Sequence, residues 1–145
     1  METERSVFWD DLVRDLDDPE FLREYVAESV RIATIDRIVN ELDEARDAAG
    51  LSKAELARAI GSEPATVRRL FSSGHVNPTL GTLAEIAAAL GMRVVLEPMG
   101  AGDTEQITCP LREGSASDSR ALATRLGELR RIGGSGRGAA ATACP

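Results

Sequence analysis

The chain has 145 residues, which is enough for one domain of ordinary size with additional segments. Apolar residues make up 43% and aromatic residues only 3%, so a core must be built from Leu, Ile, Val and Ala, as in small packed helices. No stretch of about 18 apolar residues occurs, which excludes a membrane-spanning helix. Because a leader of signal-peptide form is missing and two cysteines make no disulfide framework, we expect a cytoplasmic, nucleoid-associated location.

The net charge of −7 is unevenly distributed. Residues 1–32 hold ten acidic residues against four arginines, and residues 33–98 hold nine acidic against seven basic residues. Residues 99–145 hold five acidic residues and six arginines. Within residues 53–69, four basic residues outnumber two acidic ones. The acidic first segment indicates either a surface for a basic partner or simple solubility.

Residues 6–32 have the spacing of two amphipathic helices. Phe8, Leu12 and Leu16 recur at four-residue steps, and Pro19 stands in the first turn of a second helix. One face of that helix is apolar: Phe21, Leu22, Tyr25, Val26 and Val30. We expect residues 1–32 to cover the next domain, to dimerise or to meet a partner.

Residues 34–49 predict a strong helix that Gly50 ends. Ser52 then caps a short helix, and Glu55 three positions later completes a capping box. Gly61 marks a sharp turn that needs a positive φ.

A third short helix is predicted from Glu63 and Pro64, and a fourth over residues 80–90. The buried face of the third helix is predicted to comprise Val67, Leu70 and Phe71. The fourth presents one apolar face: Leu80, Leu83, Ile86, Ala87 and Leu90. The β-prone run Val94–Leu96 follows and predicts a short strand that Pro98 ends.

After Met99, Gly, Ser and Ala dominate, so we predict a flexible, disordered tail over residues 99–145. Within it, only residues 118–132 have helical spacing, through Leu122, Leu126 and Leu129. The predicted organisation is therefore a helical segment over 1–32, an all-α bundle with one short strand over 33–98, and this tail.

The run LSKAELARAIGSEPATVRRLF at residues 51–71 resembles the Cro/repressor (XRE) helix-turn-helix family, and the resemblance extends over about residues 34–97. It implies an all-α helix-turn-helix bundle that binds double-stranded DNA. Two short helices at a tight Gly turn let the second helix lie in the major groove while the first spans the backbone. The resemblance also implies a homodimer that regulates transcription from an inverted-repeat operator.

The resemblance assigns roles by position. Lys53 is expected at a phosphate, Arg68 at the edge of a guanine base, and Ala65 at a thymine methyl group. The full set of expected DNA-binding residues is Ser52, Lys53, Ser62, Glu63, Ala65, Thr66, Arg68 and Arg69. Pro64 and Ala65 replace a polar pair of the family, so DNA shape is expected to carry more of the specificity. Phe71 replaces a common Glu and is expected in the core.

The segment from Leu16 to Tyr25, with Asp-Pro-Glu at its centre, resembles the segment that precedes the helix-turn-helix in HigA-like antitoxins of type II toxin–antitoxin operons. That resemblance implies a basic toxin of the RelE, ParE or HigB kind and repression of the operon's own promoter. The expected partner-binding residues are Asp10, Asp11, Asp15, Asp17 and Asp18. A stand-alone repressor and an interaction module that no longer reads DNA remain alternatives. No catalytic, metal or cofactor motif is present, so an enzyme is not expected.

Overall fold

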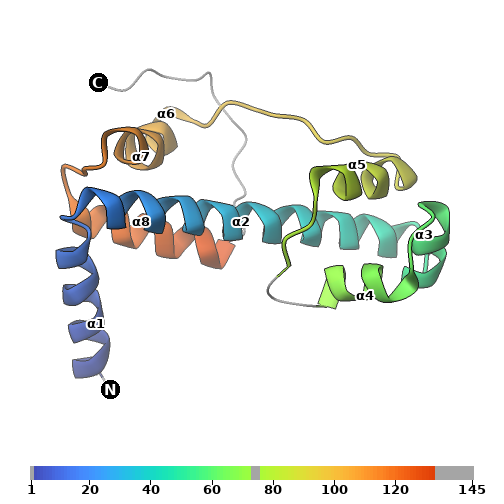
Figure 1. Cartoon of the computed structure of the whole chain (residues 1–145), viewed down its shortest axis with the longest axis horizontal. Coiled ribbons are helices and arrows are strands. Elements are labelled where there is room, and N and C mark those ends of the chain that lie inside the picture. The colour runs from blue at the N-terminus through green and yellow to red at the C-terminus, as the bar shows by residue number, and fades with distance from the viewer. Residues whose placement is uncertain (1, 73–75, 133–145) are drawn as a thin grey trace. The chain divides into compact units, whose positions relative to one another are not determined.

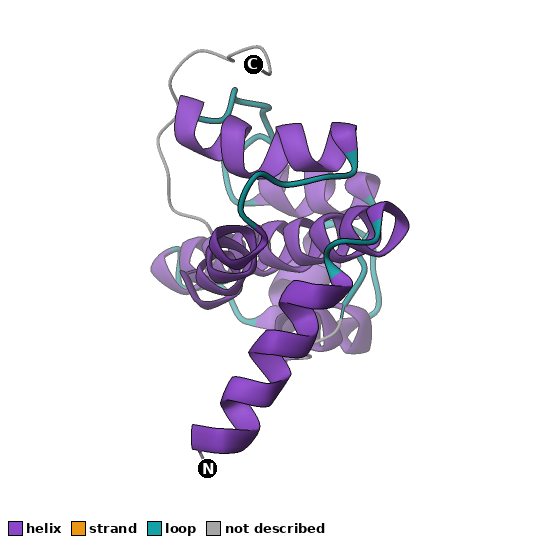
Figure 2. Cartoon of the chain, turned by 90° about the vertical axis from the view of Figure 1, so that its left-hand side faces the viewer, coloured by secondary structure: helices purple, strands orange, loops and turns teal. Residues whose placement is uncertain are grey.

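The computed structural model describes residues 2–72 and 76–132, and these residues form helices and loops without a β-strand (Figures 1 and 2). The predicted all-α class is confirmed for this part of the chain. Within the same residues, no helix is both long and apolar enough to cross a membrane. The helices are α1 Glu2–Asp15, α2 Pro19–Ala48, α3 Lys53–Ala59, α4 Pro64–Ser72, α5 Leu80–Ala89, α6 Ala101–Asp103, the π-helical turn η1 Thr104–Thr108, α7 Cys109–Glu113 and α8 Ser119–Ile132.

Helix α2 is continuous over 30 residues, where the sequence pattern predicted two helices meeting near residue 33. It begins at Pro19 as predicted, and the Asp18 carboxylate accepts a hydrogen bond from the Glu20 amide at 3.1 Å. The stretch from Glu20 to Ala49 contains neither Gly nor Pro, so nothing in it ends a helix.

The described chain divides into two compact units, and α2 contributes residues to both. Unit 2 is residues 35–96, and its core joins the second half of α2 to α3, α4 and α5. The buried residues of this core are Val39, Leu42, Leu56, Ala57, Val67, Leu70, Leu83, Ile86 and Ala87. They are all aliphatic, as the composition predicts for a chain poor in aromatic residues.

Unit 1 combines residues 1–34 with the chain from residue 97 onward. Its core joins α1 and the first half of α2 to η1 and α8. The buried residues of this core are Leu12, Leu16, Leu22, Val26, Ile107, Leu122, Ala123 and Leu126. The predicted flexible tail is therefore wrong for residues 101–113, which are helical, whereas the helix expected over residues 118–132 is formed as α8. Together these segments supply half of the buried residues of this core. Residues 133–145 lie outside the described residues.

The correction has a physical reason that local composition could not show. Leu122 and Leu126 of α8 share a core with Leu12 of α1 and with Leu16 just after that helix, more than a hundred positions earlier in the chain. A marginal amphipathic helix gains most of its stability from such packing and little from its own propensity. On the apolar face of α1, Leu12 is buried in this core, whereas Phe8 is 62% exposed.

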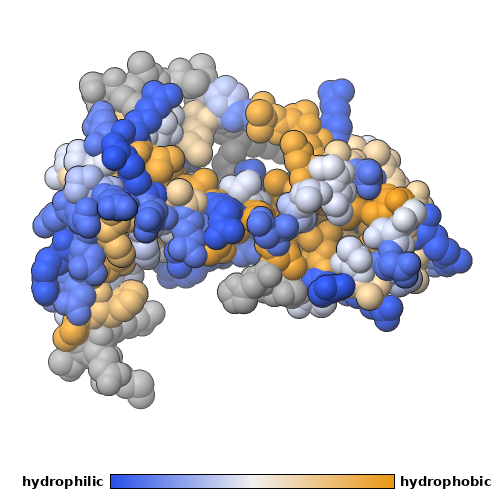
Figure 3. All heavy atoms as spheres, viewed as in Figure 1, coloured by the Kyte–Doolittle hydropathy of each residue, from blue (hydrophilic) through white to orange (hydrophobic). Residues whose placement is uncertain are grey.

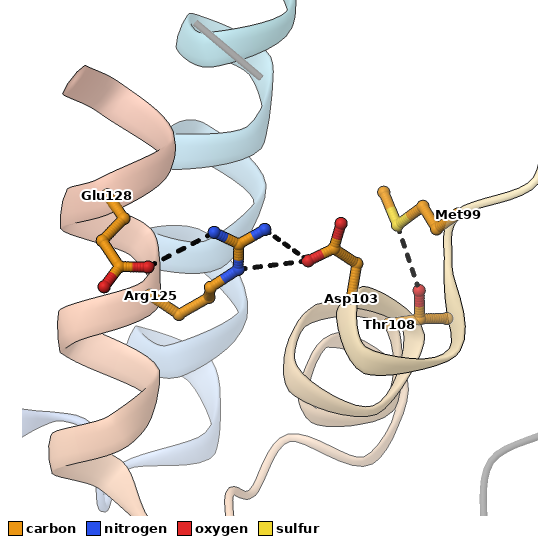
Figure 4. Close-up of polar contacts among 5 residues, drawn as sticks. All are labelled: Met99, Asp103, Thr108, Arg125 and Glu128. Carbon is orange, nitrogen blue, oxygen red and sulfur yellow. Dashed lines mark hydrogen bonds and ion pairs between the residues drawn. The ribbon is translucent and has the colours of Figure 1, made fainter. Parts of the chain in front are cut away.

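A polar contact ties α8 to the turn that follows residue 100 (Figure 4). Arg125 donates from Nε to the Asp103 carboxylate at 3.1 Å and pairs with Glu128 at 3.4 Å. Hydrogen bonding to Asp103 holds the pKa of Arg125 above its ordinary value, so the guanidinium stays charged. In the same view, the Thr108 hydroxyl donates to the Met99 sulfur at 3.7 Å.

Arg23 ties α2 to the end of α7 in a similar way. Its guanidinium donates to the carbonyl oxygens of Leu111 at 3.2 Å and Arg112 at 3.0 Å, two of the last carbonyls of that helix. Gly114, with φ +75°, turns the chain here, and a Cβ at this position would lie 2.9 Å from Cζ of Arg23. Only glycine allows both the backbone conformation and this close approach.

The predicted strand at Val94–Leu96 is not formed, since residues 93–100 have no regular secondary structure. A strand exists only through hydrogen bonds to a neighbouring strand. The described residues of this chain provide no such neighbour.

Candidate nucleic-acid interface

Helix α3 has the capped ends that its sequence predicts. The Ser52 hydroxyl accepts a hydrogen bond from the Glu55 amide at 3.0 Å, which satisfies one of the free amides of the first turn. At the other end, the Ser62 amide donates to the Ala57 carbonyl at 2.8 Å, and Gly61 has φ +66°. This is a Schellman ending, and it sets the tight turn between α3 and α4.

Helix α4 begins at Pro64, where the fixed φ of proline suits the first turn. Val67 and Leu70 are buried, with 1% and 6% of their surface exposed, and they face the core of unit 2. The opposite side of α4 carries Arg68, which is exposed. Because α3 and α4 pack directly on each other, α4 presents one polar face outward on a rigid support.

The eight expected DNA-binding residues occupy the ends and the outer side of α3 and α4. Lys53 and Ser62 are half-buried, and the other members of the set are exposed. Arg68 lies back along its own helix, with Nε 3.4 Å from the Pro64 carbonyl oxygen. Within the described residues, no ion pair is formed by Lys53, Arg68 or Arg69. Their charges are therefore not neutralised by the carboxylates of this part of the chain.

Phe71 lies at the edge of the core, as the sequence predicts. Its side chain is half-buried and packs against the core of unit 2. The Arg46 guanidinium lies 6.0 Å from the centroid of its ring, a cation–π arrangement. Arg46 also donates to the Leu51 carbonyl at 2.6 Å and to the Asp43 carboxylate at 2.9 Å. This one side chain links the end of α2, the start of α3 and the end of α4.

Arg46 and Arg58 lie in or beside the two motif helices and were not among the predicted site residues. Arg58, in the last turn of α3, is exposed and forms no ion pair within the described chain. The excess of basic residues over 53–69 was the signal that pointed to it. Arg46 holds the motif together, and nothing in its local sequence distinguishes it from a surface residue on α2.

The five expected partner-binding aspartates are all exposed, but three of them already have intramolecular roles. Asp10 pairs with Arg120 of α8 at 2.9 Å, and Asp11 pairs with Arg14 at 3.0 Å. Asp18 caps α2. The side chains of Asp15 and Asp17 have no hydrogen bond or ion pair within the described residues. The free acidic surface of this segment is thus smaller than its sequence predicts.

Neither the curated proteins nor the solved structures contain a match to this chain. One family model does match it. Residues 42–95, from the last part of α2 to near the end of unit 2, match a model described as helix-turn-helix.

Proposed function

We propose that the chain is a sequence-specific transcriptional regulator that inserts α4 into the major groove of duplex DNA. The observation that carries the proposal is the two-sided character of α4 inside a matched helix-turn-helix domain: Val67 and Leu70 are buried while Arg68 is exposed. Six of the eight residues proposed to contact DNA are exposed and two are half-buried, so none is fully buried. Basic side chains that form no ion pair within the described residues suit contacts to phosphates and bases.

The residues of the interface have distinct roles. Lys53, beside the capped start of α3, contacts a phosphate together with nearby backbone amides. Thr66 and Arg69 contact the DNA backbone. Arg68 donates to the edge of a guanine base, and Ala65 packs on a thymine methyl group. Ser52, Ser62 and Glu63 stand at the starts of the two helices, where they contact the backbone or a base at the edge of the site.

The test compares Arg68→Ala with Lys53→Ala in gel shifts over a series of salt concentrations. Arg68→Ala should cost about 1–3 kcal/mol on the preferred site and relax the preference at one base pair. Lys53→Ala should weaken binding to all DNA sequences alike. It should also reduce the slope of the logarithm of the binding constant against the logarithm of the salt concentration by about 1. Arg131→Ala, an exposed arginine of α8, is the matched control. A site preference that survives Arg68→Ala would remove Arg68 as the base-reading residue.

The biological role that we propose is that of an antitoxin, which binds a basic toxin encoded beside it and represses their common promoter as a homodimer. The support is the resemblance of the Leu16–Tyr25 segment and its acidic surface. Deleting residues 1–32 would remove half of the unit 1 core, so it is a poor test. The better variant is Asp15→Asn with Asp17→Asn, since neither side chain has an intramolecular partner in the described chain.

A pull-down with the product of the neighbouring gene should lose affinity in this double variant and should not do so in Glu105→Gln. Equal capture by both variants would argue against steering by these aspartates. The alternative is a stand-alone repressor, which the engagement of Asp10 and Asp11 in ion pairs favours. The neighbouring gene discriminates between the two, because an antitoxin requires a small basic protein encoded beside it.

A further inference from the structure

An extended apolar run follows α5 and has no partner in the described chain. Val94 and Val95 are 39% and 59% exposed, and Leu96 is 99% exposed. The amides of residues 93–99 donate no backbone hydrogen bond within the described residues. Figure 3 shows apolar surface along the segment between α5 and α6. Consecutive exposed β-prone residues with free backbone groups are a template for pairing with another strand.

The sequence of this run, Arg-Val-Val-Leu-Glu, is complementary to itself in the antiparallel direction. With Val95 opposite Val95 of a second copy, Arg93 lies opposite Glu97 of that copy, and Val94 opposite its Leu96. The Arg93–Glu97 and Val94–Leu96 pairs then each occur twice about a two-fold axis, and the Val95 pair lies on it. Parallel pairing would instead place arginine opposite arginine and glutamate opposite glutamate, which destabilises a sheet.

The alternation of a strand sorts these residues onto two faces. Val94 and Leu96 share one face, so the pair of strands presents four aliphatic side chains together. Arg93 and Glu97 lie on the other face with Val95. Neither Arg93 nor Glu97 forms an ion pair within the described residues, so both charges are available to a second copy.

From this complementarity we infer that Arg93–Glu97 is a self-association strand, which forms an antiparallel two-stranded ribbon with the same segment of a second copy. This inference rests on the proposed homodimer and specifies its contact. The ribbon follows directly after α5, the helix that closes the core of unit 2. Pairing would thereby join two helix-turn-helix domains about one axis, as an inverted-repeat operator requires.

The test is sedimentation equilibrium of the full chain without DNA, with charges exchanged across the ribbon. Arg93→Glu or Glu97→Arg alone replaces two opposite-charge pairs with two like-charge pairs. Either change should raise the dimer dissociation constant about tenfold or more. The double exchange restores both pairs and should return the constant to within about threefold of the original. Glu105→Arg, the same charge change at an exposed position outside the strand, should have no effect.

Unchanged dimerisation in both single variants, or a wild-type chain that stays monomeric up to about 100 µM, would overturn the inference. A second variant, Leu96→Asp, tests the apolar face. It should weaken the dimer while leaving the helical circular dichroism unchanged, since Leu96 contributes nothing to a core. The contact would belong to another surface if Leu96→Asp dimerised normally and the double charge exchange did not restore dimerisation.

Failure of this inference can be distinguished from failure of the proposed function. If the chain is monomeric, still shifts operator DNA in a gel and loses its site preference in Arg68→Ala, the DNA-binding function holds and the strand pairing is refuted. If the chain dimerises and follows the charge-exchange pattern but does not bind DNA at low salt, the strand pairing holds and the regulatory function is refuted.

Discussion

At the scale of single residues, arginines connect segments that are separate in the sequence. Arg46 links three helix ends of unit 2, and Arg23 and Arg125 connect α2 and α8 to the segment that follows residue 100. A guanidinium can do this because its donors lie in a fixed plane and its face packs on an aromatic ring. Lysine has neither property.

Replacing Arg46 tests this role. Arg46→Lys keeps the charge but loses the paired geometry to Asp43, the bond to Leu51 and the contact with Phe71. The side chain is only 15% exposed, so we expect the free energy of unfolding to fall by about 1–3 kcal/mol. Urea unfolding followed by circular dichroism measures it. Arg58→Lys, at an exposed position of α3, should change it by less than about 0.5 kcal/mol.

Gly114 gives a second prediction at this scale. In Gly114→Ala, holding alanine in the left-handed backbone conformation should lower the free energy of unfolding by about 1–2 kcal/mol. The added Cβ also displaces Arg23 from the two carbonyl oxygens, at a further cost of about 1 kcal/mol. Urea unfolding monitored by the fluorescence of Trp9, the single tryptophan and a residue of unit 1, reports the change. Gly102→Ala is the control, because nothing lies within 4 Å of its added Cβ. An equal loss of unfolding free energy in Gly114→Ala and Gly102→Ala would refute the role of the close approach of Arg23 to Gly114.

At the scale of elements, the helix ends of unit 2 are set by local chemistry, as are the starts of α2 at Asp18 and of α8 at Asp118 in unit 1. Ser52 and Gly61 delimit α3, and Thr79 caps α5 by accepting from the Thr82 amide at 3.1 Å. These signals lie within a few residues of the feature that they determine, so they could be predicted from sequence. The helices between Ala101 and Glu113 lack side-chain caps where they begin, and their formation depends on packing against distant residues.

The cap of α5 can be tested directly. Thr79→Ala removes the acceptor for the Thr82 amide and should cost about 1 kcal/mol of stability, while Thr79→Ser keeps a hydroxyl and should be nearly neutral. The urea midpoint followed by circular dichroism measures both. Equal midpoints for the alanine and serine variants would mean that the hydroxyl contributes nothing.

The sequence predicted the motif helices, the turn at Gly61 and the burial of Val67 and Leu70, since these follow from local spacing. It did not predict the pairing of α1 with α8, because their contacting residues are separated by most of the chain and the intervening Gly- and Ser-rich composition indicates disorder. The ion pair of Asp10 with Arg120 was missed for the same reason. A strand at residues 94–96 was predicted from propensity alone, and propensity provides no partner.

At the scale of the whole molecule, two separate cores predict two separable unfolding events. Leu126 and Leu56 are both fully buried, one in each unit. Either leucine changed to alanine should cost about 2–5 kcal/mol locally. Leu126→Ala should lower the midpoint seen by Trp9 fluorescence, while Leu56→Ala should lower only the midpoint seen by circular dichroism. Identical shifts in both signals for both variants would show that the units unfold as one.

The discontinuous make-up of unit 1 has a consequence for the order in which the protein matures on the ribosome. Residues 35–96 form their core from one contiguous stretch, so this unit can fold as soon as it leaves the exit tunnel. The leucines of α1 and early α2 must wait for α8, which is synthesised last among the described helices. During that interval, nascent chains display an uncovered aliphatic surface that chaperones and proteases recognise. Messages truncated before codon 119 would therefore yield a helix-turn-helix protein marked for degradation.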